Sequence, residues 1–299
     1  MKALLSATAF TALALSGTAS FAETNLTYMM WGDPPEIAVW EAIVDEFEAA
    51  NPDIKVKVEV SDWDSYWDKL RVTTVGGNPP DVFAMDAPLY PDWQSRGSLL
   101  DLSPYLAKAP ETLDGVYPGP LAAYQLSAGT FGLPRDFQTI VLFYNKAMFD
   151  AAGVAYPDES WTLDDLRAAA KKLTIDKDGD GRTDQWGLGT ELWDMEPMWG
   201  PVVYSYGGAP ISEDFKKTTL GDAPAAEAWK FLADFRLNDG SVMSQEDLES
   251  YGNDGFLAGV AAMTFSGHWV VPAYSDLGFE WDVAPFPKGP AGPATLVTS

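Results

Sequence analysis

Between residues 25 and 86 the sequence alternates between strand and helix patterns, and this order restricts the possible folds more than any other feature of the chain. In the clearest strand pattern, at Ile54–Val60, Ile and Val alternate strictly with Lys and Glu, as expected for a strand with one buried face. Strands joined by helices at this spacing form parallel βαβ units. The predicted strands are Asn25–Trp31, Ile54–Val60 and Asp81–Met85, and the predicted helices are Pro35–Ala49 and a segment that begins at Trp63. The chain is therefore predicted to be an α/β protein.

Indoles and carboxylates follow the ends of these predicted strands. In parallel sheets, ligands bind at the carboxyl ends of the strands. A neutral sugar presents apolar C–H faces that pack on aromatic rings, and hydroxyl groups that need directed donors and acceptors, so an indole beside a carboxylate suits it. A core Trp and a helix-capping Asp would give the same pattern, and the sequence leaves both interpretations open. The candidate ligand-binding residues of this region are Trp31, Asp33, Asp62, Trp63 and Asp86.

The stretch Phe131–Phe149 predicts a passage from one lobe to another. Its segment Gly132–Pro134 breaks regular structure, and the β-branched and aromatic run Thr139–Tyr144 predicts a buried strand. Asp136 and Gln138 lie between the breaker and the strand. We therefore expect both side chains at the crossing, where a cleft can close on a small molecule.

The second half of the chain also mixes helices and strands. Thr162 and Asp165 match a capping box at the start of a helix, and Ser244 and Asp247 match another. Helices are predicted from Thr162, over Trp193–Tyr206 and Pro224–Leu237, and from Ser244 to Leu257, and strands over Val260–Phe265 and Trp281–Pro285.

An acidic loop that begins at Asp176 matches part of a calcium-binding pattern. Acids occupy positions 1, 3, 5 and 9, and Gly181 occupies position 6, as in a calcium loop. Position 12 is Gly187, where the pattern requires a bidentate Glu, so a plain turn is the alternative. We expect no cofactor except a structural Ca²⁺, with Asp176, Asp178, Asp180 and Asp184 as its candidate ligands.

The first 22 residues match a secretory signal peptide. Lys2 precedes the apolar run Ala3–Leu15, and Ser20–Ala22 is a small-x-small cleavage site. The mature chain is therefore predicted to begin at Glu23 and to lie in the periplasm of a Gram-negative cell.

Composition excludes several classes of function. The chain has no cysteine, so it forms no disulfide and offers no thiol for a lipid anchor, which favours a soluble protein. Its net charge is −25. Without Lys2, 18 basic residues remain against 44 acidic ones, or −26. A chain this acidic repels nucleic acid and anionic membranes, and it weakly disfavours an anionic ligand.

Five motifs carry a resemblance over about Asn25–Pro287. In order, they are WEAIVDEFEAANPDIKVKVE, GGNPPDVFAMD, GLP with LFYNKAMFDAAG, WTLDDLRAAAKKLT and AAMTFSGHW. Together they resemble the extracellular solute-binding proteins of ABC transporters, in the sugar-binding family that includes maltose-binding protein.

This resemblance implies a periplasmic binding protein fold of two α/β lobes with the ligand cleft between them. The first lobe is expected over residues 23–130, the second over 136–282, and a return crossing to the first lobe over 283–299. Because family members usually continue past this point, the C-terminal part of the fold is expected to be missing.

The resemblance also implies further site residues. The family commonly places a stacking Trp in a G-x-W turn, which here is Gly267 to Trp269, and a ligand-facing helix, which here carries Trp193 and Trp199. His268, inside the turn, is expected to be a surface or hydrogen-bonded residue.

The function expected from these features is that of a monomeric, non-enzymatic binding protein. It would capture a neutral sugar or oligosaccharide and hand it to the permease subunits of an ABC importer, with lobe closure as the signal that the permease reads. Two alternatives remain: an exported carbohydrate-active hydrolase, because paired carboxylates and aromatic subsites suit one, and a binding protein for a phosphorylated polyol.

Overall fold

The computed structural model describes residues 23–126, 129–212, 214, 216–295 and 297–298, so the predicted signal peptide lies outside the described residues. The chain forms two compact units, and the boundary falls between Met85 and Asp86. The predicted lobe boundaries at residues 130 and 136 stay a prediction.

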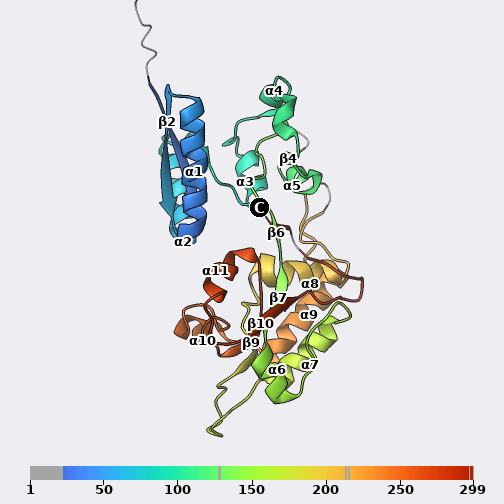
Figure 1. Ribbon diagram of the computed structural model, residues 1–299. Coiled ribbons are helices and arrows are strands. Elements are labelled where there is room, and N and C mark those ends of the chain that lie inside the picture. Colours follow the sequence, from blue (N-terminus) through green and yellow to red (C-terminus); the bar gives the residue numbers. More distant parts are fainter. Residues whose placement is uncertain (1–22, 127–128, 213, 215, 296, 299) are drawn as a thin grey trace, which may run out of the picture. The chain divides into compact units, whose positions relative to one another are not determined.

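The first unit is a parallel three-stranded sheet with the order β2-β1-β3 and two helices (Figure 1). This confirms the predicted βαβ order. The register runs from Thr24 opposite Ile54 to Trp31 opposite Ser61. The elements are β1 (Thr24–Trp31), α1 (Pro34–Ala50), β2 (Ile54–Ser61), α2 (Trp63–Val75) and β3 (Val82–Phe83).

The third strand is shorter than the predicted Asp81–Met85. The backbone N–H of Ala84 still donates to the Met29 carbonyl, at 2.9 Å. The Ala84 carbonyl, however, accepts a hydrogen bond from the Tyr66 hydroxyl at 2.5 Å. A side chain from α2 thus takes the acceptor that a longer strand would use for its ladder.

Helix α1 shows only part of its predicted apolar face buried. Ile37, Trp40 and Val44 are half-buried, while Phe47, which was predicted to share that face, is exposed. The prediction was therefore wrong for Phe47, while the neighbouring Glu48 turns to β2 and accepts hydrogen bonds from Lys55 and the Val56 backbone N–H.

The second unit is built on a mixed sheet with the order β10-β7-β9-β8. Strand β7 (Val141–Asn145) runs antiparallel to both β9 (Ala261–Ser266) and β10 (Trp281–Ala284), whereas β8 (Trp186–Leu188) runs parallel to β9. Figure 1 shows α6 to α9 gathered on one side of these strands and α10 and α11 on the other.

Alternating side chains of β7 divide the interior of this unit into two cores. Leu142 and Tyr144 belong to the larger core, which α6 to α9 cover, while Phe143 between them joins Phe256 and Tyr274 in a smaller aromatic core. This is the two-residue period of a strand that is buried on both faces.

The helices and short strands of the second unit have the following bounds: α3 Tyr90–Ser95, α4 Ser103–Leu106, α5 Pro118–Ala123, β4 Gln125–Leu126, β5 Gly129–Thr130, β6 Gln138–Thr139, α6 Lys146–Ala152, α7 Leu163–Leu173, α8 Gly200–Ser205, α9 Ala223–Leu237, α10 Gln245–Ser250, α11 Val271–Tyr274 and β11 Val297–Thr298. Short 3-10 turns occupy Pro110–Leu113 and His268–Val270, and a π-helical turn occupies Met195–Trp199.

Two of the predicted helices differ in extent. The predicted helix Trp193–Tyr206 begins only at Met195, with a π-helical turn before α8. Helix α10 ends at Ser250 instead of Leu257, because Gly252 and Asn253 adopt positive φ angles of 70° and 64°. Two successive left-handed residues cannot continue a right-handed helix.

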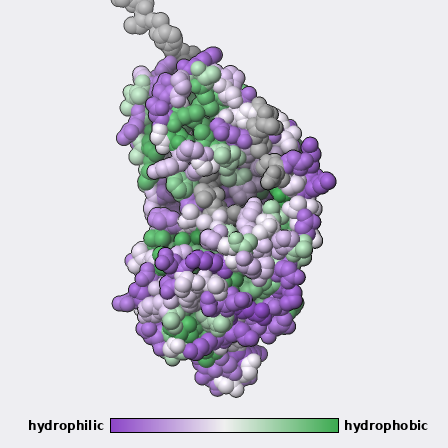
Figure 2. Space-filling model, turned by 90° about the vertical axis from the view of Figure 1, so that its right-hand side faces the viewer, coloured by the Kyte–Doolittle hydropathy of each residue, from purple (hydrophilic) through white to green (hydrophobic). Residues whose placement is uncertain are grey.

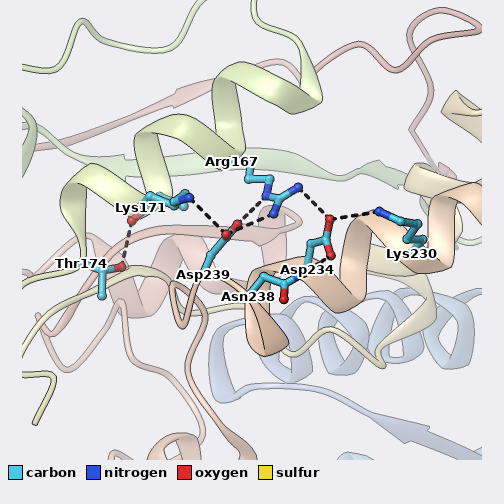
Figure 3. Close-up of polar contacts among 8 residues, drawn as sticks. Arg167, Lys171, Thr174, Lys230, Asp234, Asn238 and Asp239 are labelled. Carbon is cyan, nitrogen blue, oxygen red and sulfur yellow. Dashed lines mark hydrogen bonds and ion pairs between the residues drawn. The ribbon is translucent and has the colours of Figure 1, made fainter.

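Ion pairs fasten α7 to α9 and to the loop that follows it (Figure 3). The Arg167 guanidinium donates to both Asp239 and Asp234, and Lys171 contacts Asp239 at 3.2 Å. The Asp239 side chain is only 2% exposed, and hydrogen bonding from Arg167 lowers its pKa.

Both predicted capping boxes are present, with Thr162 at the start of α7 and Ser244 at the start of α10.

The C-terminal stretch returns to the predicted crossing. Strand β11 pairs antiparallel with β6, and the Thr295 hydroxyl donates to the Ile140 carbonyl at 2.9 Å. Two segments that lie far apart in the sequence thus lie side by side next to the start of β7.

Candidate functional site

Each unit places indoles and carboxyls at the ends of its strands. In the first unit, four aromatic rings gather beyond the carboxyl ends of β1 and β2. The Trp31 ring lies 5.0 Å from the Trp63 ring, in an edge-to-face arrangement, and 5.4 Å from the Trp67 ring. Trp67 and Tyr66 are buried, whereas Trp63 is 46% exposed. Trp63 is therefore the indole of this cluster with the most surface open to a ligand.

The two predicted acids of the first unit differ in their engagement. The Asp62 carboxylate caps α2 by accepting from the Ser65 backbone N–H at 3.1 Å, and this bond lowers its pKa. Asp33 is the N-cap residue of α1, but its exposed side chain makes no capping hydrogen bond. Asp62 thus caps a helix with its side chain. The Asp33 carboxylate stands at the N-terminus of α1 and does not cap it.

In the second unit, sheet topology brings predicted site residues to one edge. Because β8 and β9 are parallel, the residues that follow them, Trp193 and Trp269, come to the same edge of the sheet. Strand β7 begins at this edge, since Val141 pairs with Ser266. Gln138, three residues earlier in β6, is half-buried there.

Gly267 and Trp269 depend on each other sterically. The indole of Trp269 folds back over Gly267 so closely that a Cβ on Gly267 would lie 2.0 Å from the ring atom Cζ3. Trp269 itself is 39% exposed. Gly267 therefore sets the position of a partly exposed ring at the end of β9, and the neighbouring His268 points to solvent.

Two carboxyls and an arginine surround the carboxyl of Asp86, a residue that is only 8% exposed. Glu196 is half-buried and hydrogen bonds to Asp86, and the charges of Asp194 and Arg135 act on the same carboxyl. Burial raises the pKa of Asp86 to about 7 and that of Glu196 to about 8. Burial also raises the pKa of Asp194, although this side chain has more contact with solvent.

This arrangement holds one proton between two carboxyls near neutral pH. The hydrogen bond lowers the pKa of Asp86 and raises that of Glu196, so the proton belongs to Glu196, which donates to the Asp86 carboxylate.

The other predicted acid of this region, Asp136, lies next to Arg135 in an ion pair with 3.2 Å between Nε and Oδ2.

The two predicted indoles that follow β8 are joined by a third one that sequence reasoning missed. Trp229 of α9 stacks on Trp193 at 6.3 Å and contacts Trp199 at 5.3 Å. Trp199 and Trp229 pack against the larger core, whereas Trp193 is 61% exposed.

Sequence reasoning also missed Glu196 and Asp194. A signal was present in the sequence, because two acids in the stretch Trp193–Trp199 stand between indoles already assigned to the site.

The acidic loop brings three of its four predicted metal ligands together. Carboxylate oxygens of Asp176, Asp178 and Asp184 all lie within 4.8 Å of one another. Asp180 is not part of this group, and its carboxylate accepts a hydrogen bond from the Arg182 backbone N–H. The calcium site therefore stays a prediction, with three ligands in place of four.

The chain is similar to known proteins both in sequence and in structure. A family model described as "Bacterial extracellular solute-binding protein" matches residues 31–299. An ABC substrate-binding protein from Listeria monocytogenes, solved in complex with cycloalternan, is 30% identical with a TM-score of 0.82, over 92% of this chain and 69% of that one.

Two curated relatives are more distant in sequence. A putative binding protein from Brucella abortus is 26% identical over 94% of this chain and 67% of its own length. A maltotriose-binding protein from Pyrococcus abyssi is 22% identical over 85% of this chain and 51% of its own length.

Among the described residues, no helix is both long and apolar enough to cross a membrane.

Proposed function

Because this chain belongs to the bacterial extracellular solute-binding protein family, we propose that it captures a neutral sugar or oligosaccharide and delivers it to the permease of an ABC importer. The protein then changes no covalent bond, needs no cofactor for binding, and works in the periplasm as a monomer. A calcium ion in the acidic loop would be structural.

The observation that carries this proposal is the pairing of exposed indoles with carboxyls at the strand ends of both units. In the first unit, Trp63 directly follows Asp62 in the sequence. In the second unit, Trp269 follows β9, and Glu196, which hydrogen bonds to Asp86, lies in the π-helical turn that follows the neighbouring strand β8. Exposed rings suit the C–H faces of a sugar, and carboxylates accept charge-assisted hydrogen bonds from its hydroxyls. Relatives whose names include maltotriose and cycloalternan support a carbohydrate ligand.

The geometry argues against both alternatives. In most glycosidases the two catalytic carboxyls stand about 5–5.5 Å or 6.5–9.5 Å apart, so that a sugar carbon or a water fits between them. Asp86 and Glu196 are instead hydrogen-bonded to each other. An anionic ligand such as a phosphorylated polyol would approach the carboxyls of Asp86, Asp194 and Glu196. Negative charge on these groups repels the negative charge of such a ligand.

The test is a binding screen against mono- and oligosaccharides, followed by titration calorimetry with the best ligand. We expect Trp269→Ala to weaken binding by about 1–3 kcal/mol, because a stacking ring is lost. Tyr251→Ala is the matched control. Tyr251 lies in the turn after α10, its side chain is 40% exposed against 39% for Trp269, and its ring contacts Trp186 of β8. The control should bind normally.

Other results would redirect the proposal. If both variants bind like the wild type, Trp269 is not in the site. Release of a hydrolysed product from the bound sugar would favour the hydrolase, and stabilisation by phosphorylated polyols alone would favour the third function.

A further inference from the structure

Trp193 lies on a turn, outside any helix or strand, between β8 and the π-helical turn Met195–Trp199. The preceding Leu192 is buried and anchors the backbone, but Trp193 itself is 61% exposed. Within the described residues, Trp229 supplies the one aromatic ring that contacts the Trp193 ring. A large exposed side chain has several rotamers, and a ligand that needs one of them binds more weakly because it must exclude the others. The readiness of Trp193 for a ligand therefore depends on Trp229.

Trp229, in contrast, lies on an element that is held firmly. Its neighbours in α9, Ala228 and Leu232, are fully buried in the larger core, and Trp229 itself packs against that core. Farther along the same helix, Asp234 accepts a hydrogen bond from Arg167 of α7 at 2.9 Å. Both the backbone and the side chain of Trp229 are thus fixed by contacts that do not involve a ligand.

Trp229 is the middle ring of a row of three indoles. Its ring is stacked on Trp193 with an angle of 25° between the planes, and it lies 5.3 Å from the ring of Trp199, which packs on the larger core. Because Trp229 is half-buried with a ring on either side of it in this row, it has little surface left for a sugar. It can, however, pass the rigidity of the core on to the exposed ring of Trp193.

We infer that Trp229 is a positioning residue of the ligand site, which does not contact the sugar but holds the Trp193 ring in the orientation in which a sugar stacks on it. The inference rests on the proposed function, and on Trp193 as one of its candidate ligand-binding residues. A ring that is already immobilised spares the ligand the cost of immobilising it, which corresponds to roughly 2- to 10-fold in affinity.

The first measurement needs no ligand. In protein labelled with 5-fluorotryptophan, each of the 12 indoles contributes a fluorine NMR resonance, and Trp193→Phe identifies the resonance of Trp193 by its loss. Trp229→Ala should narrow this resonance and move it toward that of free 5-fluorotryptophan, because the ring gains motion and solvent. Trp229→Phe should restore most of the shift because it keeps a ring. An unchanged Trp193 resonance in Trp229→Ala would overturn the inference.

The second measurement is a double-mutant cycle of affinity. Wild type, Trp193→Ala, Trp229→Ala and the double variant are titrated by calorimetry with maltotriose and mannotriose. Trp229→Ala should weaken binding roughly 2- to 10-fold in the wild-type background. In the Trp193→Ala background it should have no further effect, because no ring remains to be positioned. The same loss in both backgrounds would mean that Trp229 acts independently of Trp193, contrary to the inference.

Trp161→Ala separates positioning from a general loss of packing. Trp161 is also a half-buried indole packed against the larger core, where it contacts Phe149 at 6.2 Å. This variant should lower the melting temperature as Trp229→Ala does, but leave the Trp193 resonance and the affinity unchanged. If it weakens binding as much as Trp229→Ala, the effect is one of stability and the inference is wrong while the proposed function stands.

Failure of the proposed function would look different. A wild type that binds neither sugar would contradict that function for these ligands, and the role of Trp229 in binding would fail with it. The fluorine spectra would still show whether Trp229 holds the Trp193 ring.

Discussion

At the scale of single residues, the Asp86–Glu196 pair makes stability depend on pH. Both carboxyls bind a proton more tightly in the folded chain than in the unfolded one, with pKa values of about 7 and 8 against ordinary values of 3.8 and 4.5. Between about pH 4 and pH 8 the folded state therefore carries more protons, so the free energy of unfolding falls as the pH rises. The pair therefore lowers the free energy of unfolding least at low pH and most above pH 8.

Glu196→Gln should reduce this dependence. The amide cannot ionise, yet it still donates a hydrogen bond to the Asp86 carboxylate. We expect the variant to be more stable than wild type by about 2 kcal/mol at pH 8, and nearly equal to it at pH 5. Urea unfolding at the two pH values measures this, with the exposed Glu41→Gln as control. A variant less stable than wild type at pH 8 would contradict the proton-sharing pair.

Residue types at strand ends could be predicted from the sequence, but their partners could not. Trp63 and Trp67 lie one helical turn apart on the same face of α2, so no periodicity could show that Trp67 is buried and Trp63 exposed. Likewise, Asp86 was predicted to lie at a strand end, whereas its hydrogen bond to Glu196 joins residues far apart in the chain, which only tertiary folding brings together.

At the scale of elements, local signals were the most reliable. Both capping boxes are confirmed because their hydrogen bonds close within three residues of the chain. The end of α10 was missed although the pair Gly252-Asn253, a combination that readily adopts positive φ, was visible in the sequence. The π-helical turn before α8 has no sequence pattern of its own, so the predicted helix started too early.

The acidic loop gives the prediction at this scale. Three carboxylates without a bound cation repel one another, so Ca²⁺ at 10 mM should raise the melting temperature by a few degrees. A dissociation constant of about 10⁻⁴–10⁻³ M, as in extracellular modules, corresponds to roughly 1.4–2.7 kcal/mol.

Because Asp180 lies outside the group of three, the structure supplies a matched pair of variants. Asp178→Asn should abolish the rise, while Asp180→Asn should keep it. Scanning calorimetry with Ca²⁺, Mg²⁺ and a chelator measures all three proteins. An equal shift in both variants, or no shift in the wild type, would exclude the three-carboxylate site.

At the scale of the whole molecule, the predicted two-lobe periplasmic binding protein fold is confirmed by similarity to the Listeria monocytogenes protein. The two-lobe arrangement was expected from the resemblance, whereas the order of strands and helices by itself predicted only parallel βαβ units, which restrict how a chain can be connected. The arrangement of the second sheet was not predictable, since three of its strands come from distant parts of the chain and β8 is only three residues long.

The surface of the whole chain gives the last prediction. With a net charge of −25, long-range repulsion among carboxylates opposes the compact state. Figure 2 shows hydrophilic residues interspersed with hydrophobic areas on the visible face. Exposed ion pairs such as Arg96–Asp92 oppose this repulsion, but each contributes only about 0–1 kcal/mol.

Screening should therefore stabilise the protein. The Debye length falls from about 30 Å at 0.01 M salt to about 10 Å at 0.1 M. We expect the melting temperature at pH 7 to rise by a few degrees over this range and then to level off. NaCl and KCl should act equally, because screening depends on ionic strength and not on ion identity. A melting temperature that falls with salt would mean that attraction within ion pairs, such as those of Arg167, outweighs the net repulsion.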